Sequence, residues 1–355
     1  MDDLSENIID PADAAQSAGL RYVTDEKPGI TRRKSGKGWS YRDPRGQKIS
    51  KTEVIARINK LAVPPAYEDV WICPQADGHI QATGRDAKGR KQYRYHERFR
   101  EVQESAKYEH MLAFAKLLPG IRAKCAEHMK LPGLPREKVL ATIVHLLEST
   151  MIRVGNADYV KQNKSYGLTT LNDRHVKIEK GELRFRFKGK SGKEWNLSHK
   201  DKRIAKIVRQ CQDLPGQHLF QYVGEDGERH EVTSSDVNAY LREIAGQGVT
   251  AKYFRTWTGT VLAALALSEF EIFDSDAAAK KNIRAAIEQV AARLGNTPTV
   301  CRKCYVHPAI IDGYLDKALA LELREEVERE LVEDVGSLRP EEAVVLAFLQ
   351  KRLSA

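Results

Sequence analysis

The sequence lacks most of the features that mark secreted, membrane-bound or ATP-driven proteins. It has five cysteines in 355 residues, an odd and widely scattered set that does not make a disulfide framework. No run approaches the roughly 18 apolar residues that a membrane span requires. Its acidic, polar beginning is not that of a secretory signal. We therefore expect a protein of a reducing, cytoplasmic setting.

Motifs for nucleotide and metal chemistry are absent as well. There is no G-x-x-x-x-G-K-[ST] phosphate loop and no tight group of Asp and Glu at metal-ligand spacing. Cys301 and Cys304 form a C-x-x-C pair, but a structural zinc needs about four ligands and the other cysteines lie singly. No strand precedes the pair, as a redox motif would require. We expect these cysteines to pack on a helix, and we expect no metal and no cofactor.

Positive charge is concentrated in the first third of the chain. The net charge is +9, with 58 Lys and Arg against 49 Asp and Glu. Residues 32–51 hold eight basic residues and one acidic residue, and residues 79–100 hold seven and two, whereas residues 321–355 hold nine acidic and five basic residues. Clustered basic charge favours a polyphosphate partner, because each neutralised phosphate releases condensed counterions. A merely solvated basic surface is the alternative that charge alone leaves open.

Residues 1–105 read as a small β-rich domain. Strand-like runs at residues 38–49, 69–74 and 79–96 are broken by the turn signals Asp43-Pro44-Arg45-Gly46 and Asp86-Ala87-Lys88-Gly89. One helix is expected around Lys51–Leu61, before two prolines.

Residues 106–355 read as a larger, mainly helical domain, so the predicted fold class is α+β. Arg174–Ser198 alternates apolar and polar residues around two glycine turns, which predicts a three-stranded antiparallel meander. Apolar residues at helical spacing predict seven helices, at Arg98–Leu118, Arg136–Met151, Ser235–Ile244, Phe254–Leu267, Ala277–Leu294, Leu315–Val335 and Pro340–Leu353.

Tyr305 stands near the end of a further, very short helix. Thr297 and Pro298 make a good helix start, with a hydroxyl cap and proline at the first helical position, and Pro308 ends the run. A phenol is a weak nucleophile, so it needs cationic neighbours or a proton acceptor. A tyrosine considered by itself is more typical of a half-buried core residue than of a nucleophile.

Three cations occur along the chain in an informative order. Arg153 follows an apolar helix in "LLESTMIRVGN", Lys190 sits in the hairpin turn of "FRFKGKSGKEW", and Arg255 opens the apolar helix of "AKYFRTWTGT". Each alone is typical of an ordinary structural residue. Together with Tyr305 they resemble the catalytic domain of type IB DNA topoisomerases, in the compact poxvirus-like branch found in bacteria.

Further stretches extend this resemblance over roughly Arg42 to Asp316. "KQNKSYGLTTLNDRHV" before the hairpin and the G-x-T-P…Y spacing after it match the catalytic domain, and "GRDAKGRKQYRYH" resembles the strand pair of the family's N-terminal clamp domain. The resemblance implies a C-shaped clamp of two domains, residues 1–105 and 106–355, around double-stranded DNA.

The resemblance also implies roles for the site residues. Tyr305 would be the nucleophile that becomes linked to the 3′ phosphate, Arg153 and Arg255 would stabilise the transition-state phosphate, and Lys190 would be the general acid. Arginine suits such a phosphate because its planar fork binds two oxygens and needs no metal. Asn296 stands where poxviral and eukaryotic members carry His. An amide donates a hydrogen bond but carries no charge, so we expect only a phosphate hydrogen bond there. Capping of the turn after Gly295 is the alternative.

The DNA-binding residues that the resemblance suggests in the clamp domain lie on one strand. Gln92, Tyr93 and Tyr95 alternate with Lys91 and Arg94, which we interpret as an aromatic and amide face opposite a basic face. Ordinary β-propensity and core packing of the tyrosines is the alternative.

The predicted function is relaxation of positive and negative supercoils by transient single-strand cleavage, without ATP and without an obligatory metal. A tyrosine recombinase is the nearest alternative, but these usually carry His three residues before the second arginine, where Lys252 stands. A non-catalytic DNA-binding protein of the same fold is the other alternative. We expect a monomer, because one tyrosine cutting one strand suffices, and association with the nucleoid.

Overall fold

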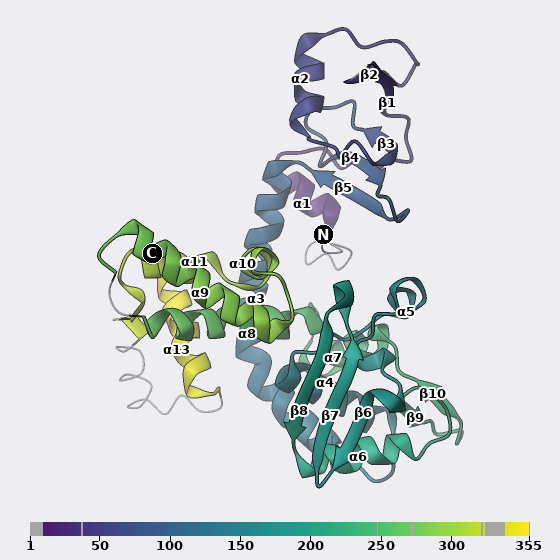
Figure 1. Ribbon diagram of the computed structural model, residues 1–355, viewed down its shortest axis with the longest axis vertical. Helices are drawn as coiled ribbons and strands as arrows, with labels where there is room; N and C mark the ends of the chain where they lie inside the picture. The colour runs from purple at the N-terminus through teal and green to yellow at the C-terminus, as the bar shows by residue number, and fades with distance from the viewer. Residues whose placement is uncertain are drawn as a thin grey trace. The chain divides into compact units, whose positions relative to one another are not determined.

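The computed structural model describes residues 10–36, 38–246, 248–270, 273–320, 322–323 and 338–354. The chain forms two compact units, Met1–His110 and Met111–Ala355. The division falls inside the long helix α3 (Glu97–His128), a few residues after the domain boundary that the sequence suggests. Both units mix helices with antiparallel sheet, which agrees with the predicted α+β class (Figure 1).

The N-terminal unit is built on a five-stranded antiparallel sheet. The predicted hairpin after residue 79 is confirmed, and Asp43 closes the other predicted turn by accepting hydrogen bonds from the backbone N–H groups of Arg45 and Gln47. One strand, β1, has mostly exposed residues, three of them basic, and was not recognised. The strand order is β2-β1-β3-β4-β5, with bounds β1 Ile30–Ser35, β2 Gly38–Arg42, β3 Glu68–Ile72, β4 Ile80–Arg85 and β5 Lys91–Tyr95.

Two small helices complete this unit's cores. Helix α2 (Thr52–Lys60), predicted around Lys51–Leu61, packs Ile58 against buried residues of the sheet such as Ile30 and Ile72. Helix α1 (Pro11–Ser17) was not predicted, and its alanines form a second cluster with Phe99 at the start of α3. One face of the sheet is therefore buried against α2.

The C-terminal unit is mainly helical, as predicted. Helix α3 runs ten residues past the predicted end at Leu118 and through Pro119, because Ile121 and Cys125 beyond the proline are buried in the core. The other helices are α4 Arg136–Thr150, α5 Ala157–Asn163, α6 Lys202–Gln212, α7 Ser234–Ala245, α8 Ala251–Ser268, α9 Asp276–Leu294, α10 Pro298–Tyr305, α11 Pro308–Leu315 and α13 Pro340–Ser354.

The predicted meander is confirmed inside this unit. Strands β6 (Val176–Glu179), β7 (Glu182–Lys188) and β8 (Glu194–Lys200) pair antiparallel in that order. Its apolar face packs against α4 and α6, and α6 was not predicted (Figure 1). A two-stranded hairpin, β9 (Gln221–Val223) with β10 (Arg229–Glu231), was also missed.

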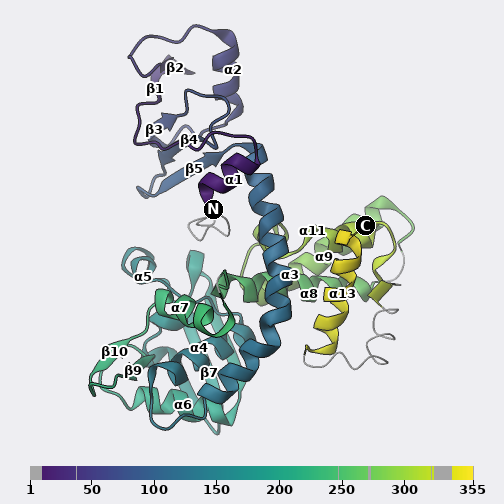
Figure 2. The same ribbon diagram turned by 180° about the vertical axis from the view of Figure 1, so that it is seen from behind.

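Helix α8 is the centre of the helical part. It is buried along most of its length, and Figures 1 and 2 show neighbouring helices gathered around it. Its contacts include α4, α7, α9, α10, α11 and α13. An apolar helix without a polar face is stable only in such a position.

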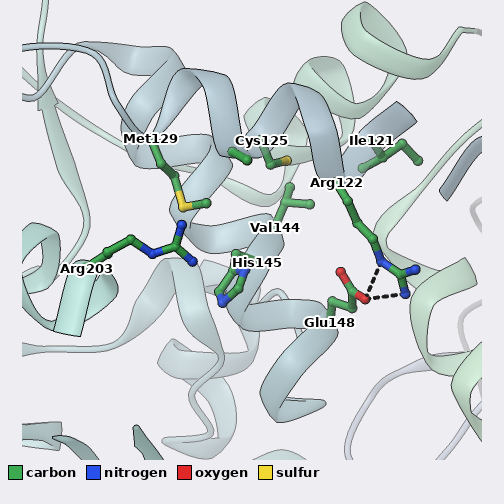
Figure 3. Close-up of a pocket in the computed structure, with 9 residues that line it drawn as sticks. Ile121, Arg122, Cys125, Met129, Val144, His145, Glu148 and Arg203 are labelled. Atoms are coloured by element: carbon green, nitrogen blue, oxygen red, sulfur yellow. Dashed lines mark hydrogen bonds and ion pairs between the residues drawn. The ribbon is translucent and has the colours of Figure 1, made fainter. Parts of the chain in front are cut away.

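The C-terminal helix α13 is fixed by a shared ion pair. The guanidinium of Arg122 donates to Glu148 at 2.6 Å and to Glu342 at 2.8 Å, and Figure 3 shows its bonds to Glu148. Burial alone would lower the pKa of Arg122, but the two carboxylates raise it.

Helix α13 was predicted. The helix predicted at Leu315–Val335 is wrong at its start, because Leu315 ends α11. The second half of that predicted helix lies outside the described residues. Within the described residues, no helix combines the length and apolarity that a bilayer crossing requires.

Candidate active site

Tyr305 ends helix α10, where the sequence placed it. Thr297 caps this helix by accepting a hydrogen bond from the Val300 N–H, and Pro298 occupies its first turn. Pro308 does more than end the run, because it begins the next helix, α11. The Tyr305 ring is buried, with 6% of the residue exposed, so its surroundings decide what its hydroxyl can do.

Arg255 on α8 packs against the ring of Tyr305. The guanidinium carbon lies 5.1 Å from the centre of the Tyr305 ring, a cation–π distance. The guanidinium also donates to the carbonyl of Met151 at the end of α4 and, at 2.6 Å, to that of Leu294 at the end of α9. Its Nε has no hydrogen-bond partner among the described residues. One buried cation thus joins the ends of three helices.

The charge of Arg255 persists despite its burial. Removal from water, and then the positive charge of Arg153, lower the pKa of Arg255 to about 10. That value remains well above neutrality, so the guanidinium is charged at physiological pH. Two arginines close enough for Arg153 to lower the pKa of Arg255 form a site that favours an anion.

Arg153 and Asn296 are joined directly. Arg153 follows α4, and its guanidinium donates to the side-chain oxygen of Asn296, which follows the C-cap Gly295 of α9. The Asn296 Nδ2 is buried without a hydrogen-bond partner among the described residues. Because the amide oxygen is engaged by Arg153, the free capacity of Asn296 is that of a donor. The carbonyl of Arg153 accepts from Leu168, which anchors this segment to the conspicuous "SYGLTT" stretch.

Lys190 lies in the turn between β7 and β8, as predicted. The backbone there is tied by Gly189 N–H to Lys193 carbonyl at 2.8 Å and Gly192 N–H to Gly189 carbonyl at 3.1 Å. The Lys190 ammonium lies 5.9 Å from the ring centre of Tyr159 on α5. A lysine on such a tight turn can present its ammonium beyond the edge of the sheet.

A close approach of two helices sets the position of Tyr305. A Cβ on Gly259 of α8 would lie 2.7 Å from the Tyr305 carbonyl oxygen and 3.1 Å from its Cβ. The next residue, Thr260, donates its hydroxyl to the Thr256 carbonyl at 2.9 Å, with the Tyr305 carbonyl oxygen 3.3 Å away, and accepts from the N–H of His307 at 3.1 Å. Only glycine permits this packing, and the hydroxyl then fixes the end of α10.

Sequence reasoning found the charged site residues but missed their supports. The carbonyls of Met151 and Leu294 carry no side-chain signal. Gly259 did carry one, since a glycine inside an apolar helix costs about 1 kcal/mol relative to alanine and needs a packing reason. The C-x-x-C pair lies on α10 as expected, and Cys301 is fully buried. Burial raises the pKa of the Cys301 thiol to about 11, so it stays protonated.

The five predicted DNA-binding residues lie on β5, but the interpretation of its faces is wrong. Successive side chains of a strand alternate, so Lys91, Tyr93 and Tyr95 share one face while Gln92 and Arg94 share the other. The lysine ammonium accordingly lies 5.4 Å from the Tyr93 ring centre, and the two tyrosine rings stack at 5.7 Å.

Most of these side chains already have partners within the N-terminal unit. Lys91 pairs with Asp25 at 2.7 Å, and Tyr95 stacks on Phe99 at 5.2 Å. Gln92 bonds Asp86. Tyr93, by contrast, is 38% exposed, so it is the member best suited to touch a ligand.

One group of side chains in the C-terminal unit has the composition of a metal site. Potential ligand atoms of His145, His199 and Asp201 lie within 4.8 Å of one another, beside a cavity of about 80 Å³ that His145 and Arg203 line in Figure 3. Both oxygens of Asp201 are already engaged, one by the N–H groups of Arg203 and Ile204 at the start of α6, the other by the Arg203 guanidinium at 3.4 Å. Helix capping and ion pairing therefore account for this carboxylate without a metal.

Comparison with known proteins agrees with this architecture. A family model described as "Eukaryotic DNA topoisomerase I, catalytic core" matches residues 96–331, and one described as "Bacterial DNA topoisomerase IB, N-terminal domain" matches residues 38–86. The C-terminal unit thus has the catalytic core of a DNA topoisomerase I.

Individual relatives narrow the assignment. The DNA topoisomerase 1B of Acanthamoeba polyphaga mimivirus is 34% identical over 300 residues, which are 82% of this chain and 89% of the relative. The DNA topoisomerase 1B of Vaccinia virus (strain Copenhagen) is 23% identical over 255 residues, 71% of this chain and 77% of the relative. The chain belongs to the type IB DNA topoisomerase family.

The packing of Gly259 gives a testable prediction. Gly259→Ala should lower the free energy of unfolding by about 1–2 kcal/mol, because the strain of overpacking against the Tyr305 backbone outweighs the gain in helix propensity. Denaturant unfolding measures this change.

Gly120 in α3 is the matched control. A Cβ there meets nothing within 4 Å, so Gly120→Ala should stabilise by about 0.5–1 kcal/mol. Equal and stabilising effects of both substitutions would show that α8 and α10 are not in close contact at Gly259.

Proposed function

We propose that this type IB topoisomerase relaxes positive and negative supercoils through Tyr305. The Tyr305 hydroxyl loses its proton to solvent as its oxygen bonds to the phosphorus of one strand, and the bond from phosphorus to the 5′ oxygen breaks. The product is a 3′-phosphotyrosyl linkage and a free 5′ hydroxyl end. The reverse reaction restores the strand after the free end has rotated.

The arginines supply the charge that this reaction requires. Negative charge grows on the non-bridging oxygens in the transition state, and preorganised cations stabilise it there more than in the ground state. Arg153 and Arg255 are the proposed donors. The observation that carries the proposal is the arrangement around Tyr305: the Arg255 guanidinium lies over its ring, and the Nε of Arg255 and the Nδ2 of Asn296 are buried donors without partners among the described residues.

Lys190 is the proposed general acid. An alkoxide is a poor leaving group, so a proton must reach the 5′ oxygen as its bond to phosphorus breaks. Lys190 lies on the turn between β7 and β8 and Tyr305 on α10, so we propose that protonation and attack come from different elements of the site.

No fuel and no obligatory metal are needed in this scheme. The phosphotyrosyl bond conserves the energy of the broken phosphodiester, and two arginines take the place that a metal holds in other phosphoryl-transfer enzymes. We propose that the enzyme is a monomer, because a single tyrosine cuts a single strand. Its proposed substrate is double-stranded DNA at the nucleoid.

The N-terminal domain, residues 1–105, is proposed to grip the DNA as one half of a C-shaped clamp whose other half is the catalytic domain, residues 106–355. Its match to a topoisomerase N-terminal domain and its basic runs support this role. Tyr93 and Lys91 on β5 are the proposed contacts, and Tyr95 holds them in place from its stack on Phe99.

Plasmid relaxation tests the proposal. Positively and negatively supercoiled plasmids should both relax with EDTA present and ATP absent, and Tyr305→Phe should abolish relaxation because it removes the nucleophilic oxygen. Quenching with detergent should trap a covalent protein–DNA adduct only with the parent enzyme.

The other outcomes are informative as well. An adduct without relaxation would favour a recombinase. DNA binding with neither adduct nor relaxation would leave a non-catalytic DNA-binding protein, and relaxation by Tyr305→Phe would refute the nucleophile.

The amide at Asn296 predicts a pH dependence. A histidine at this position, with an ordinary pKa of about 6.5, would lose its charge as the pH rises through that value. Because Arg153 disfavours a second cation beside it, Asn296→His should add an inflection at or below about pH 6.5 to the profile of the single-turnover cleavage rate. The parent should lack this inflection, and Asn296→Ala should be slow at every pH. Identical profiles for the parent and Asn296→His would argue against contact with the phosphate.

The face of β5 gives a further prediction. Tyr93→Ala should weaken duplex binding by about 1 kcal/mol, roughly fivefold, with little change in the free energy of unfolding, because the ring is exposed. Tyr95→Ala should instead destabilise the protein by about 2 kcal/mol, because its ring packs among aromatic neighbours. Fluorescence anisotropy with labelled duplex and denaturant unfolding separate the two effects. A stability loss in Tyr93→Ala would contradict the assignment.

A further inference from the structure

Trp195 on β8 lies between the two segments that carry Lys190 and Asn296. A Cβ on Gly189 would lie 2.7 Å from Nε1 in the five-membered ring of the indole, and a Cβ on Gly295 would lie 2.7 Å from Cζ2 in its six-membered ring. Each of these glycines directly precedes a proposed site residue. The indole therefore packs with its five-membered ring against the turn of Lys190 and with its six-membered ring against the loop of Asn296.

The orientation of the indole is itself fixed. Trp195 pairs across the sheet with Phe187, and the two rings stack with centroids 6.0 Å apart and planes 5° from parallel. Phe187 is buried, so the indole is supported from the core side of the meander. A rigid aromatic ring held in this way fixes distances better than a flexible aliphatic side chain, because it has only two side-chain torsions.

The surroundings make this contact important. A cavity of about 240 Å³ lies beside Trp195, and its walls include Thr150 of α4, Arg293 of α9 and Gly295. Strand β8 is thus not packed continuously against the ends of these helices. The hairpin turn is also held at Lys188, whose carbonyl accepts from the N–H of Tyr166. That bond fixes the base of the turn, whereas the indole fixes its spacing from Asn296.

We propose that Trp195 is a positioning residue that sets the Lys190 ammonium against the phosphate-binding loop of Asn296 and Arg153. This inference rests on the proposed function, in which Lys190 protonates the 5′ oxygen. Because the ring touches Gly189 and Gly295 rather than the site residues themselves, its role is one of distance and orientation. Misplacement of a catalytic group by about 1 Å can cost roughly 100-fold in rate.

A substrate with a better leaving group tests the inference. The scissile position is first mapped on a duplex oligonucleotide, and the duplex is then remade with sulfur in place of the bridging 5′ oxygen. A thiol has a pKa of about 8.5 and departs as a thiolate without a proton donor. A defect that arises from misplaced Lys190 should therefore disappear on the sulfur substrate.

The expected results concern single-turnover cleavage rates. Trp195→Ala should slow cleavage of the ordinary duplex by about 10- to 100-fold and restore it to near the parent rate on the sulfur duplex. Lys190→Ala should behave in the same way. The double variant should be no slower than Lys190→Ala, because both substitutions remove one function. Trp195→Phe keeps the stack on Phe187, so it should fold even where Trp195→Ala does not, and it should show a smaller, equally rescued defect.

Leu197→Ala is the matched control. Leu197 lies on the same face of β8, two residues on, and contributes packing to the meander without belonging to either turn. If Leu197→Ala lowers the cleavage rate through general destabilisation, the rate should fall equally on the two substrates. The sulfur duplex could rescue Lys190→Ala while Trp195→Ala and Trp195→Phe stay equally slow on both substrates. That result would overturn the inference about Trp195 and leave the acid role of Lys190 standing. An unrescued Lys190→Ala would overturn the acid role and the inference with it.

Discussion

The buried guanidinium of Arg255 is the interaction on which the site depends. A charge taken out of water is costly unless it is fully engaged, and here two backbone carbonyls and an aromatic ring engage it. Those carbonyls belong to Met151 and Leu294. Arg153 and Asn296 each follow two residues later, so the groups that satisfy Arg255 also determine where the two other side chains proposed to bind phosphate begin.

Close backbone approaches supply the rest of the precision. Gly259 lets α10 lie directly on α8, and the hydroxyl oxygen of Thr260 fixes the chain just after Tyr305 by accepting from the His307 N–H. Gly189 and Gly295 let one indole touch both the Lys190 turn and the Asn296 loop. A buried tyrosine and a lysine on an exposed turn are thereby held by rigid elements rather than by one another, and rigid support of this kind is what preorganised catalysis requires.

The N-terminal unit follows a different design. Its apolar residues are divided between a cluster under the sheet and a cluster between α1 and the start of α3. The charged residues of β5 form local pairs, such as Lys91 with Asp25, that keep an otherwise exposed strand soluble and ordered. Such pairs contribute little to stability at a surface, so they can be exchanged for phosphate contacts at small cost.

The sequence by itself determined the elements with strong periodicity and the chemical types at the site. The meander, α4, α7, α8, α9 and the capped α10 could be predicted because period and caps are local properties. Arg153, Lys190, Arg255 and Tyr305 could be singled out by their order along the chain and its family resemblance. Strand β1, the continuation of α3 through Pro119 and the faces of β5 were missed or misread, because tertiary packing overrides local preference there. Only the tertiary structure decided that carbonyls from two helix ends hold Arg255 and that Trp195 spans two glycines, since contacts between distant segments leave no periodic trace in the sequence.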